Sequence, residues 1–279
     1  MRGVAGLGIA MFLAAAALAA PASPGADVEI AYGGDPLQRL DFYRLRAAKP
    51  PPLLVFLHGG GWARGDKRGA TGQKPAFFAG QGYALASLNY RLVPDATVAD
   101  QARDVAAAIA MLRRDAARLG FDPDRIVIAG HSAGAHLAAL VATDPAYLTA
   151  RGVPIKALRG AILLDGAGYD VARQLNGAGP LVRRIYTRAF GADPRFHASV
   201  SPLTHAAAPN APAFLIVHDA DRLDAKGQSE ALAAALRKAG ARVALEAVPD
   251  TSHAEINRRL GDLDYAATRA AASFLRSLD

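Results

Sequence analysis

A serine between glycines stands at the centre of the segment Gly130-His131-Ser132-Ala133-Gly134. An apolar run, residues 126–129, precedes this segment, and an alanine- and leucine-rich stretch, residues 135–140, follows it. This order is typical of a buried strand that turns sharply into a helix and presents the serine hydroxyl at the turn, because the glycines permit a tight backbone bend. The helix N-terminus behind the serine favours negative charge that develops there. The pattern therefore predicts that Ser132 is a nucleophile.

A second glycine-rich segment, His58-Gly59-Gly60-Gly61-Trp62, directly follows the apolar run of residues 53–57. Successive glycines allow backbone N–H groups to turn toward a ligand without steric cost. At this place in the chain they predict an oxyanion hole made by the N–H groups of Gly60 and Gly61 together with that of Ala133. A phosphate-binding loop is disfavoured, because the lysine and the serine or threonine that it needs do not follow at the right spacing.

A nucleophilic serine also needs a base. Of the seven histidines, His253 ends a polar loop, residues 249–253, between the last predicted strand and the last predicted helix. Right-handed winding of the sheet places this loop beside the serine turn. The order serine, acid, histidine along the chain also favours His253 as the base.

The carboxylate that orients this base is expected after the strand of residues 213–218. Asp219, Asp221 and Asp224 all follow that strand. Asp221 is favoured, because a short carboxylate about three residues past a strand end is able to turn back toward an imidazole. Asp224 remains the second candidate.

Apolar runs alternate with helix-like stretches along the chain. Strands are predicted at residues 28–31, 39–45, 53–57, 83–88, 126–129, 161–164, 213–218 and 242–248, and helices at residues 97–119, 228–239 and 262–278. Strands that alternate with helices predict the α/β class, with a mostly parallel central sheet flanked by helices. Residues 166–212 lack a strand signal and are expected to form a small lid over the site. The alternative is an ordinary helical connection that packs its aromatic residues into the core. The aromatic residues Tyr169, Tyr186 and Phe190 of this segment, with Trp62, are candidates to line a substrate pocket.

Composition narrows the classes of function. The 279 residues suffice for one large domain, and their formal net charge is +7. The basic residues are scattered and do not interleave with aromatic residues, so nucleic-acid binding is disfavoured. The chain contains no cysteine, which excludes disulfides and thiolate catalysis. We expect neither a cofactor nor a metal, because the predicted chemistry needs only side chains and backbone amides.

The first residues carry one positive charge, then an apolar stretch, then small residues around position 20. This order predicts a secretory signal peptide at residues 1–22, which leaves residues 23–279 as the mature domain, periplasmic or secreted. Retention of the leader as a membrane anchor is the alternative, and it is the only predicted route to a membrane.

The chain resembles the α/β-hydrolase superfamily, in particular the branch with hormone-sensitive-lipase-like esterases, feruloyl-esterase-like proteins and kynurenine formamidases. The resemblance covers residues 35–279. It is carried by residues 58–62 with Gly65-Asp66-Lys67, by residues 89–92, by residues 122–125 leading into the serine motif, by residues 201–203, and by Ser252-His253. It implies Ser132 as nucleophile, His253 as base, and Gly60, Gly61 and Ala133 as oxyanion donors.

The resemblance implies a metal-free serine esterase that acts through an acyl-enzyme on a small-molecule ester with an aromatic or short-chain acyl group. Cleavage of an aryl formamide is the alternative. Kynurenine formamidases tend to carry a bulky aromatic residue where this chain has Gly61, which favours the esterase. A binding module without catalytic activity is the third reading, because a fold does not dictate activity.

Overall fold

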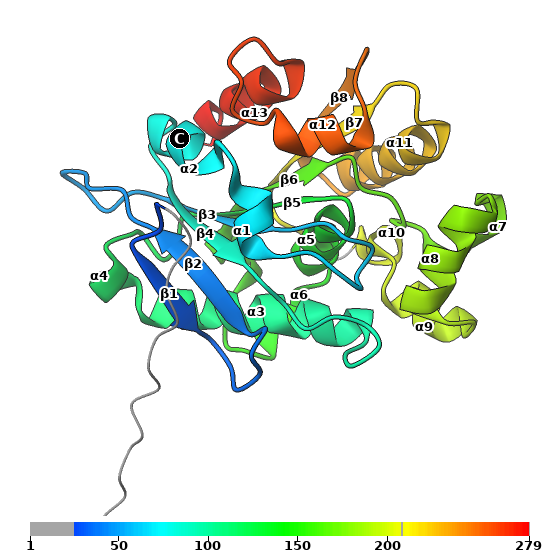
Figure 1. Cartoon of the computed structure of the whole chain (residues 1–279), viewed down its shortest axis with the longest axis horizontal. Helices are drawn as coiled ribbons and strands as arrows, with labels where there is room; N and C mark the ends of the chain where they lie inside the picture. The colour runs from blue at the N-terminus through cyan, green and yellow to red at the C-terminus, as the bar shows by residue number, and fades with distance from the viewer. Residues whose placement is uncertain (1–24, 208, 279) are drawn as a thin grey trace, which may run out of the picture.

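The computed structural model describes residues 25–207 and 209–278. Its centre is an eight-stranded sheet with the order β1-β2-β4-β3-β5-β6-β7-β8 (Figure 1). β1 and β2 pair antiparallel at one edge, β2 joins β4 antiparallel, and all other neighbours are parallel. The strands are β1 (Val28–Ala31), β2 (Arg39–Tyr43), β3 (Leu53–Leu57), β4 (Ala84–Leu88), β5 (Ile126–His131), β6 (Leu158–Leu164), β7 (Ala213–Asp219) and β8 (Arg242–Val248). The mostly parallel α/β sheet predicted from the sequence is confirmed.

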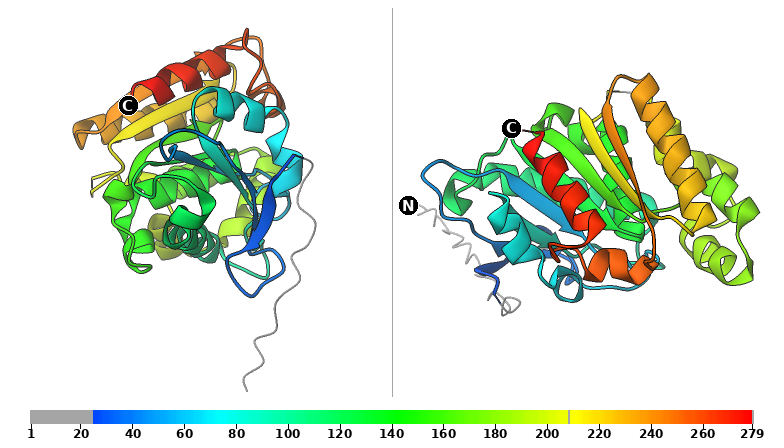
Figure 2. Two further views of the ribbon diagram at one scale, coloured as in Figure 1. Left: turned by 90° about the vertical axis from the view of Figure 1, so that its left-hand side faces the viewer. Right: turned by 90° about the horizontal axis from the view of Figure 1, so that it is seen from above.

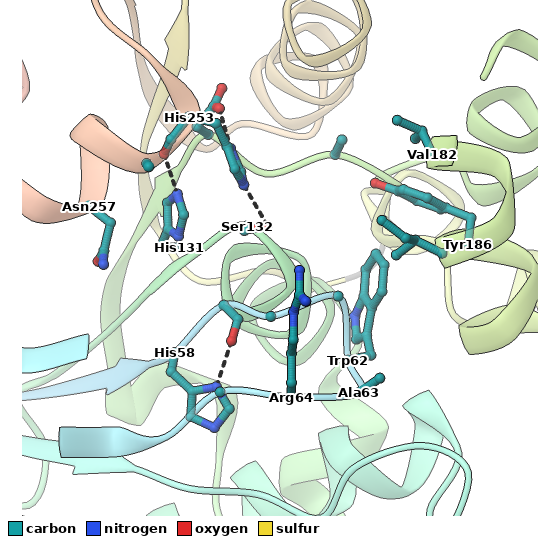
Figure 3. Close-up of a pocket in the computed structure, with 18 of the residues that line it drawn as sticks. His58, Trp62, Ala63, Arg64, His131, Ser132, Val182, Tyr186, His253 and Asn257 are labelled. Atoms are coloured by element: carbon teal, nitrogen blue, oxygen red, sulfur yellow. Dashed lines mark hydrogen bonds and ion pairs between the residues drawn. The ribbon is translucent and has the colours of Figure 1, made fainter. Parts of the chain in front are cut away.

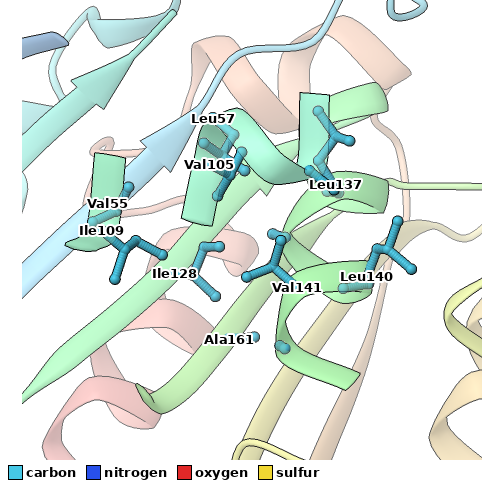
Figure 4. Packing of buried hydrophobic residues seen from close by; sticks show 14 of the residues in the cluster. Val55, Leu57, Val105, Ile109, Ile128, Leu137, Leu140, Val141 and Ala161 are labelled. Atoms are coloured by element: carbon cyan, nitrogen blue, oxygen red, sulfur yellow. The ribbon is translucent and has the colours of Figure 1, made fainter. Parts of the chain in front are cut away.

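Helices cover both faces of the sheet, as a mostly parallel sheet requires. Side chains of β3 alternate between two hydrophobic clusters: Val55 and Leu57 belong to one cluster, and Phe56 belongs to the other. On the first face, α3 (Val98–Arg114) and α5 (Ala133–Thr143) pack against the strands (Figure 4). The opposite face is covered by α2 (Lys74–Gly80) and α13 (Ala266–Arg276), the red C-terminal helix in Figure 2.

The long helix predicted over residues 97–119 is two helices in the structure. α3 begins after a capping box in which Thr97 and Asp100 satisfy each other's backbone N–H groups, and it ends at Arg114. Asp115 has a non-helical backbone and separates α3 from α4 (Ala116–Leu119). Gly120 then ends α4 in the left-handed region, at φ 81°, the conformation that favours glycine at a helix C-terminus.

The predicted lid, residues 166–212, consists of helices where the structure describes it. It contains α7 (Val171–Gly177), α8 (Pro180–Phe190), α9 (Pro194–Ser199) and α10 (Pro202–His205), inserted between β6 and β7. In Figure 1 this helical insertion, α7–α10, lies beyond the carboxyl ends of the central strands. The remaining helical elements are α1 (Lys67–Thr71), α6 (Pro145–Thr149), a short 3₁₀ turn (Ile155–Ala157), α11 (Leu223–Lys238) and α12 (His253–Arg258).

The predicted leader, residues 1–22, lies outside the described residues. Among the residues that are described, none of the helices has the length and apolarity needed to cross a bilayer.

Candidate active site

Ser132 stands between the end of β5 and the start of α5, at φ 57° and ψ −121°. Few residues other than glycine adopt this backbone conformation, and such strain is concentrated at functional sites. A Cβ at Gly134 would lie 2.3 Å from the backbone oxygen of Leu57, and one at Gly130 would lie 2.4 Å from the backbone of Gly134. The two glycines are therefore required for β5, β3 and α5 to approach one another closely at the serine.

His253 is the first residue of α12, and its Nε2 lies 2.9 Å from the Ser132 hydroxyl oxygen (Figure 3). Side chains from elsewhere hold both ends of this short helix. Nε2 of His131 donates to the carbonyl of His253 (2.7 Å), and Nζ of Lys74 donates to the carbonyl of Asn257 (2.8 Å). The imidazole is thus positioned by contacts from β5 and α2 as well as by its own loop.

His131 and Lys74 are both deeply buried, and burial changes their ionisation. Burial lowers the pKa of His131 to about 3, so its ring is neutral at pH 7. Burial also lowers the pKa of Lys74 to about 7. Both side chains therefore act here as hydrogen-bond donors to helix α12, and neither contacts the Ser132 hydroxyl.

The carboxylate that contacts the His253 imidazole belongs to Asp165, the first residue after β6. Nδ1 of His253 donates to Oδ2 of Asp165 (2.6 Å), which leaves Nε2 free to accept the Ser132 hydroxyl hydrogen. Asp165 is 0% exposed and has φ 45°, an unusual backbone conformation that turns its side chain from the strand toward α12. The prediction that Asp221 orients the base is therefore wrong about the geometry: Asp165 occupies that place.

Two groups from the end of β7 hold the Asp165 carboxylate. The backbone N–H of Asp219 donates to Oδ1 (3.0 Å), and the guanidinium of Arg222 forms an ion pair with Oδ2. Burial alone would raise the pKa of Asp165, but the hydrogen bond from His253, the charge of Arg222 and the Asp219 amide outweigh burial and lower it. Asp165 is therefore ionised at neutral pH, as an orienting carboxylate must be.

Arg222 is also close to the imidazole: its Nη1 lies 2.7 Å from Nδ1 of His253. Arginine has no acceptor, so Nδ1–H and the guanidinium donate side by side to the same carboxylate oxygen. Sequence reasoning did not consider Arg222.

The other candidate acids lie away from His253. Asp221 is exposed, and its backbone N–H donates to Oδ1 of Asp219 within the turn after β7 (3.0 Å). Asp224 accepts from Gln174 of α7 (3.0 Å) and from Arg222 (3.3 Å). Asp165 directly follows the apolar run of residues 161–164. A carboxylate at the end of that predicted strand is the sequence signal from which Asp165 could have been identified as the acid.

The glycine segment after β3 forms a loop beside Ser132. Gly60 and Gly61 have φ 127° and 60°, conformations that favour glycine, and both line the same cavity as Ser132. The N–H of Ala133 belongs to the first turn of α5, where an intrahelical acceptor is lacking. These positions are compatible with the predicted oxyanion donors.

His58 and Gly65 close this loop on itself. The His58 ring donates through Nδ1 to the carbonyl of Gly59 (2.8 Å) and stacks on Tyr90 at 4.4 Å between ring centroids. The Tyr90 hydroxyl donates to the carbonyl of His58 (2.7 Å). A Cβ at Gly65 would lie 2.2 Å from the carbonyl oxygen of Gly59, so only glycine fits where the loop returns.

A cavity of about 1000 Å³ opens over Ser132 and His253, between the glycine loop and α8. Of the predicted pocket residues, Trp62 and Tyr186 line it, although Trp62 is only 3% exposed. The prediction is wrong for Tyr169 and Phe190, which are buried outside the lining. Phe190 packs on Trp62 at 4.7 Å between centroids, so the aromatic residues of the insertion mainly form a core beneath the cavity.

Within residues 25–207 and 209–278, no three histidine, cysteine or carboxylate side chains are grouped as metal ligands would be.

The sheet order, the serine turn after β5 and the histidine after β8 define an α/β-hydrolase fold, and solved structures agree. Est2 of Thermogutta terrifontis, a thermophilic esterase with bound propionate, has a TM-score of 0.71 and 28% identity, over 92% of this chain and 94% of that one. A truncated carbohydrate esterase from gut microbiota has a TM-score of 0.74, over 92% of this chain and 98% of that one; its 23% identity shows the shared fold alone.

Sequence comparisons lead to the same class. The family model BD-FAE matches residues 40–151. Esterase LipC of Mycobacterium tuberculosis is 31% identical over 199 residues, 68% of this chain and 49% of LipC. Esterase LipQ of the same organism is 33% identical over 239 residues, 81% of this chain and 56% of LipQ. The chain spans about half the length of the curated relatives it matches. It belongs to the esterase and lipase branch of the α/β-hydrolase superfamily.

Proposed function

We propose that this protein hydrolyses carboxylic esters through an acyl-enzyme on Ser132. The observation that carries the proposal is the hydrogen-bonded chain from Ser132 through His253 to Asp165, which opens into a cavity. Serine, imidazole and buried carboxylate in this order are the parts that acyl transfer needs. The names of the relatives LipC and LipQ, both esterases, support the choice of an ester bond.

In the proposed reaction, His253 takes the Ser132 proton through Nε2 as the hydroxyl oxygen attacks the ester carbonyl. Asp165 holds the tautomer with hydrogen on Nδ1 and stabilises the imidazolium. The negative charge on the carbonyl oxygen is stabilised by the N–H groups of Gly60, Gly61 and Ala133. His253 then returns its proton to the departing alcohol, and it activates the water that releases the acid from Ser132.

Replacing the nucleophile tests this proposal. Ser132→Ala is expected to lower kcat for a short-chain 4-nitrophenyl ester by about 10³-fold or more, because no acyl-enzyme forms. Ser199→Ala is the matched control, since that hydroxyl is exposed and donates to a carbonyl within α9. A fluorophosphonate probe is expected to label the wild type and the Ser199→Ala variant, but not Ser132→Ala. Undiminished hydrolysis by purified Ser132→Ala would refute the assignment.

We further propose that residues 1–22 direct export and are removed, on the charge and apolar pattern of the leader. The N-terminal sequence of the protein purified from an expressing bacterium tests this. A mature chain that begins shortly after residue 20 supports export, and an intact Met1 in the cytoplasmic fraction contradicts it.

A further inference from the structure

The charge of the cavity over Ser132 points to a substrate class. Four arginines line this cavity, Arg64, Arg184, Arg188 and Arg222, against two carboxylates, Asp66 and Asp165. Of the three histidines that line the cavity, His58 and His131 are kept neutral by burial, which lowers the pKa of both.

One arginine and both carboxylates are already engaged within the protein. Arg222 is paired with Asp165 and with Asp224. Asp66 caps helix α1 by accepting from the N–H of Arg68 (2.8 Å), and it accepts from Nδ2 of Asn89 (2.8 Å). Neither carboxylate is therefore available to neutralise the positive charge of Arg64, Arg184 or Arg188.

The guanidinium groups of Arg64, Arg184 and Arg188 form no hydrogen bond or ion pair with the described part of the chain. They come from two segments that contact each other beside Ser132. A Cβ at Gly61 would lie 2.9 Å from Cγ2 of Ile185, so the glycine loop touches α8 there. Arg184 and Arg188 are four residues apart on α8 and share one face of it.

Arg64 lies closest in the chain to the oxyanion glycines. In Figure 3 its side chain extends from the glycine loop into the cavity, on the side of Ser132. Arg64 is exposed to solvent, so its guanidinium is accessible to a ligand in the cavity.

The remaining wall beside these arginines is aliphatic. Leu181, Val182 and Ile185 of α8 line the cavity, and Leu181 is 75% exposed. A short alkyl chain that ends in a negative charge would contact this wall and place its charge among guanidinium groups. A carboxylate matches the planar fork of donors that arginine presents.

We infer that the preferred substrate is an ester whose acyl group is a short aliphatic chain ending in a carboxylate, and that Arg64 determines this preference. The inference rests on the proposed esterase function and names its substrate class. Arg184 and Arg188 add positive charge at the mouth of the cavity, which attracts an anionic ester before it binds.

Two esters that differ only in the terminal group test the preference: 4-nitrophenyl hemiglutarate and 4-nitrophenyl pentanoate. Their acyl chains have the same number of carbons, and spontaneous hydrolysis is subtracted with Ser132→Ala. At low salt, kcat/KM is expected to favour the hemiglutarate by about tenfold or more, mainly through KM. Added sodium chloride is expected to reduce this ratio, because exposed charges are screened.

Arg64→Met is expected to bring the ratio down to about one, and Arg64→Lys to keep part of the preference, because lysine retains the charge without the fork. Arg183→Met is the matched control, since Arg183 lies on α8 but outside the cavity lining. It is expected to leave the ratio unchanged.

A wild-type ratio of about one, with Ser132-dependent hydrolysis of the pentanoate, would overturn the inference and leave the esterase function intact. If the wild-type protein hydrolysed neither ester, the esterase function would be rejected instead. In that case, calorimetric titration with glutarate decides the anion site: binding that Arg64→Met weakens supports it, and the absence of binding overturns it.

Discussion

β6 and β7 lie side by side and end at the same edge of the sheet, and each is followed by carboxylates, but the two ends serve the site differently. After β6, Asp165 is buried and contacts the His253 imidazole. The backbone N–H of Asp219, the last residue of β7, and the side chain of Arg222 in the following turn both donate to that carboxylate, while Asp221 is exposed. One strand thus supplies the acid and its neighbour supplies the donors that hold the acid ionised.

The difference arises from the backbone at each strand end. Asp165 turns at once, at φ 45°, and its N–H still donates to the carbonyl of Val217 on β7 (2.7 Å). β7 continues through Asp219, and the next turn is closed by Asp219 itself, which accepts from the N–H of Asp221. The position of an acid in the chain order therefore does not specify which strand end carries it.

Exchanging the acids for amides tests this comparison most strongly. Asp165→Asn is expected to lower kcat on the order of 10³–10⁴-fold, because the amide neither enforces the tautomer of His253 nor stabilises its imidazolium. Initial rates of ester hydrolysis measure this, with circular dichroism to verify the fold. A loss of this size in Asp221→Asn, with Asp165→Asn still active, would show that Asp221, after β7, is the acid that orients His253.

Replacing Arg222 tests how much the cation that follows β7 contributes to the stability of the protein. Arg222→Met is expected to lower the free energy of unfolding at pH 7 by about 1–3 kcal/mol, because a buried carboxylate loses a charged hydrogen-bond partner. Urea denaturation measures the change. Arg118→Met, which breaks an exposed pair with Asp115, is the control and is expected to cost less than about 1 kcal/mol. Equal losses in the two variants would show that Arg222 is only a surface charge.

The pH dependence of protein stability tests whether the folded protein holds the Asp165 carboxylate ionised. The folded protein holds the pKa of Asp165 below its ordinary value, so the unfolded chain takes up the proton first as pH falls. The stabilisation is present above about pH 4 and is lost as pH falls through the folded pKa. Asp165→Asn is therefore expected to show a shallower loss of stability below about pH 5 than the wild type in urea titrations. An unchanged slope would contradict the lowered pKa.

The smallest effect is expected at Asp224. Its carboxylate joins Gln174 of α7 to Arg222, away from the imidazole. Asp224→Asn keeps an acceptor oxygen for both partners, so kcat/KM is expected to change by less than about threefold, since exposed ion pairs contribute little. Steady-state kinetics at pH 7 measure it, beside Asp221→Asn, which is expected to match the wild type. A loss of tenfold or more would mean that the network from α7 to Arg222 positions the site.

Much of the framework was accessible from the sequence. The buried strands β3, β5 and β7 are apolar runs with clear ends, so they lie where the sequence predicts them to within two residues. β8, the partly exposed strand at one edge of the sheet, also lies where it is predicted. The glycine–serine–glycine pattern and the late histidine depend on short, local backbone requirements, and the structure brings Ser132 and His253 into contact. The break at Asp115 within the predicted long helix was not visible, because the apolar spacing continues across it.

The pocket was harder to predict, because apolar side chains have the same pattern whether they line a cavity or fill a core. Tyr169 and Phe190 were expected at the cavity and are buried. Arg64, Arg184 and Arg188, polar residues in a loop and on a helix face, line the cavity instead.

The amino-acid sequence by itself determined the strands, the sharp turn that presents Ser132 and the loop that leads into α12 at His253, because each follows from local backbone preference and from the burial of apolar runs. Only the tertiary structure decided that Asp165 and not Asp221 reaches the imidazole, and that guanidinium groups surround the cavity. Both outcomes depend on the direction that side chains take where separate strands and helices meet, and that direction is set by the packing of the whole chain.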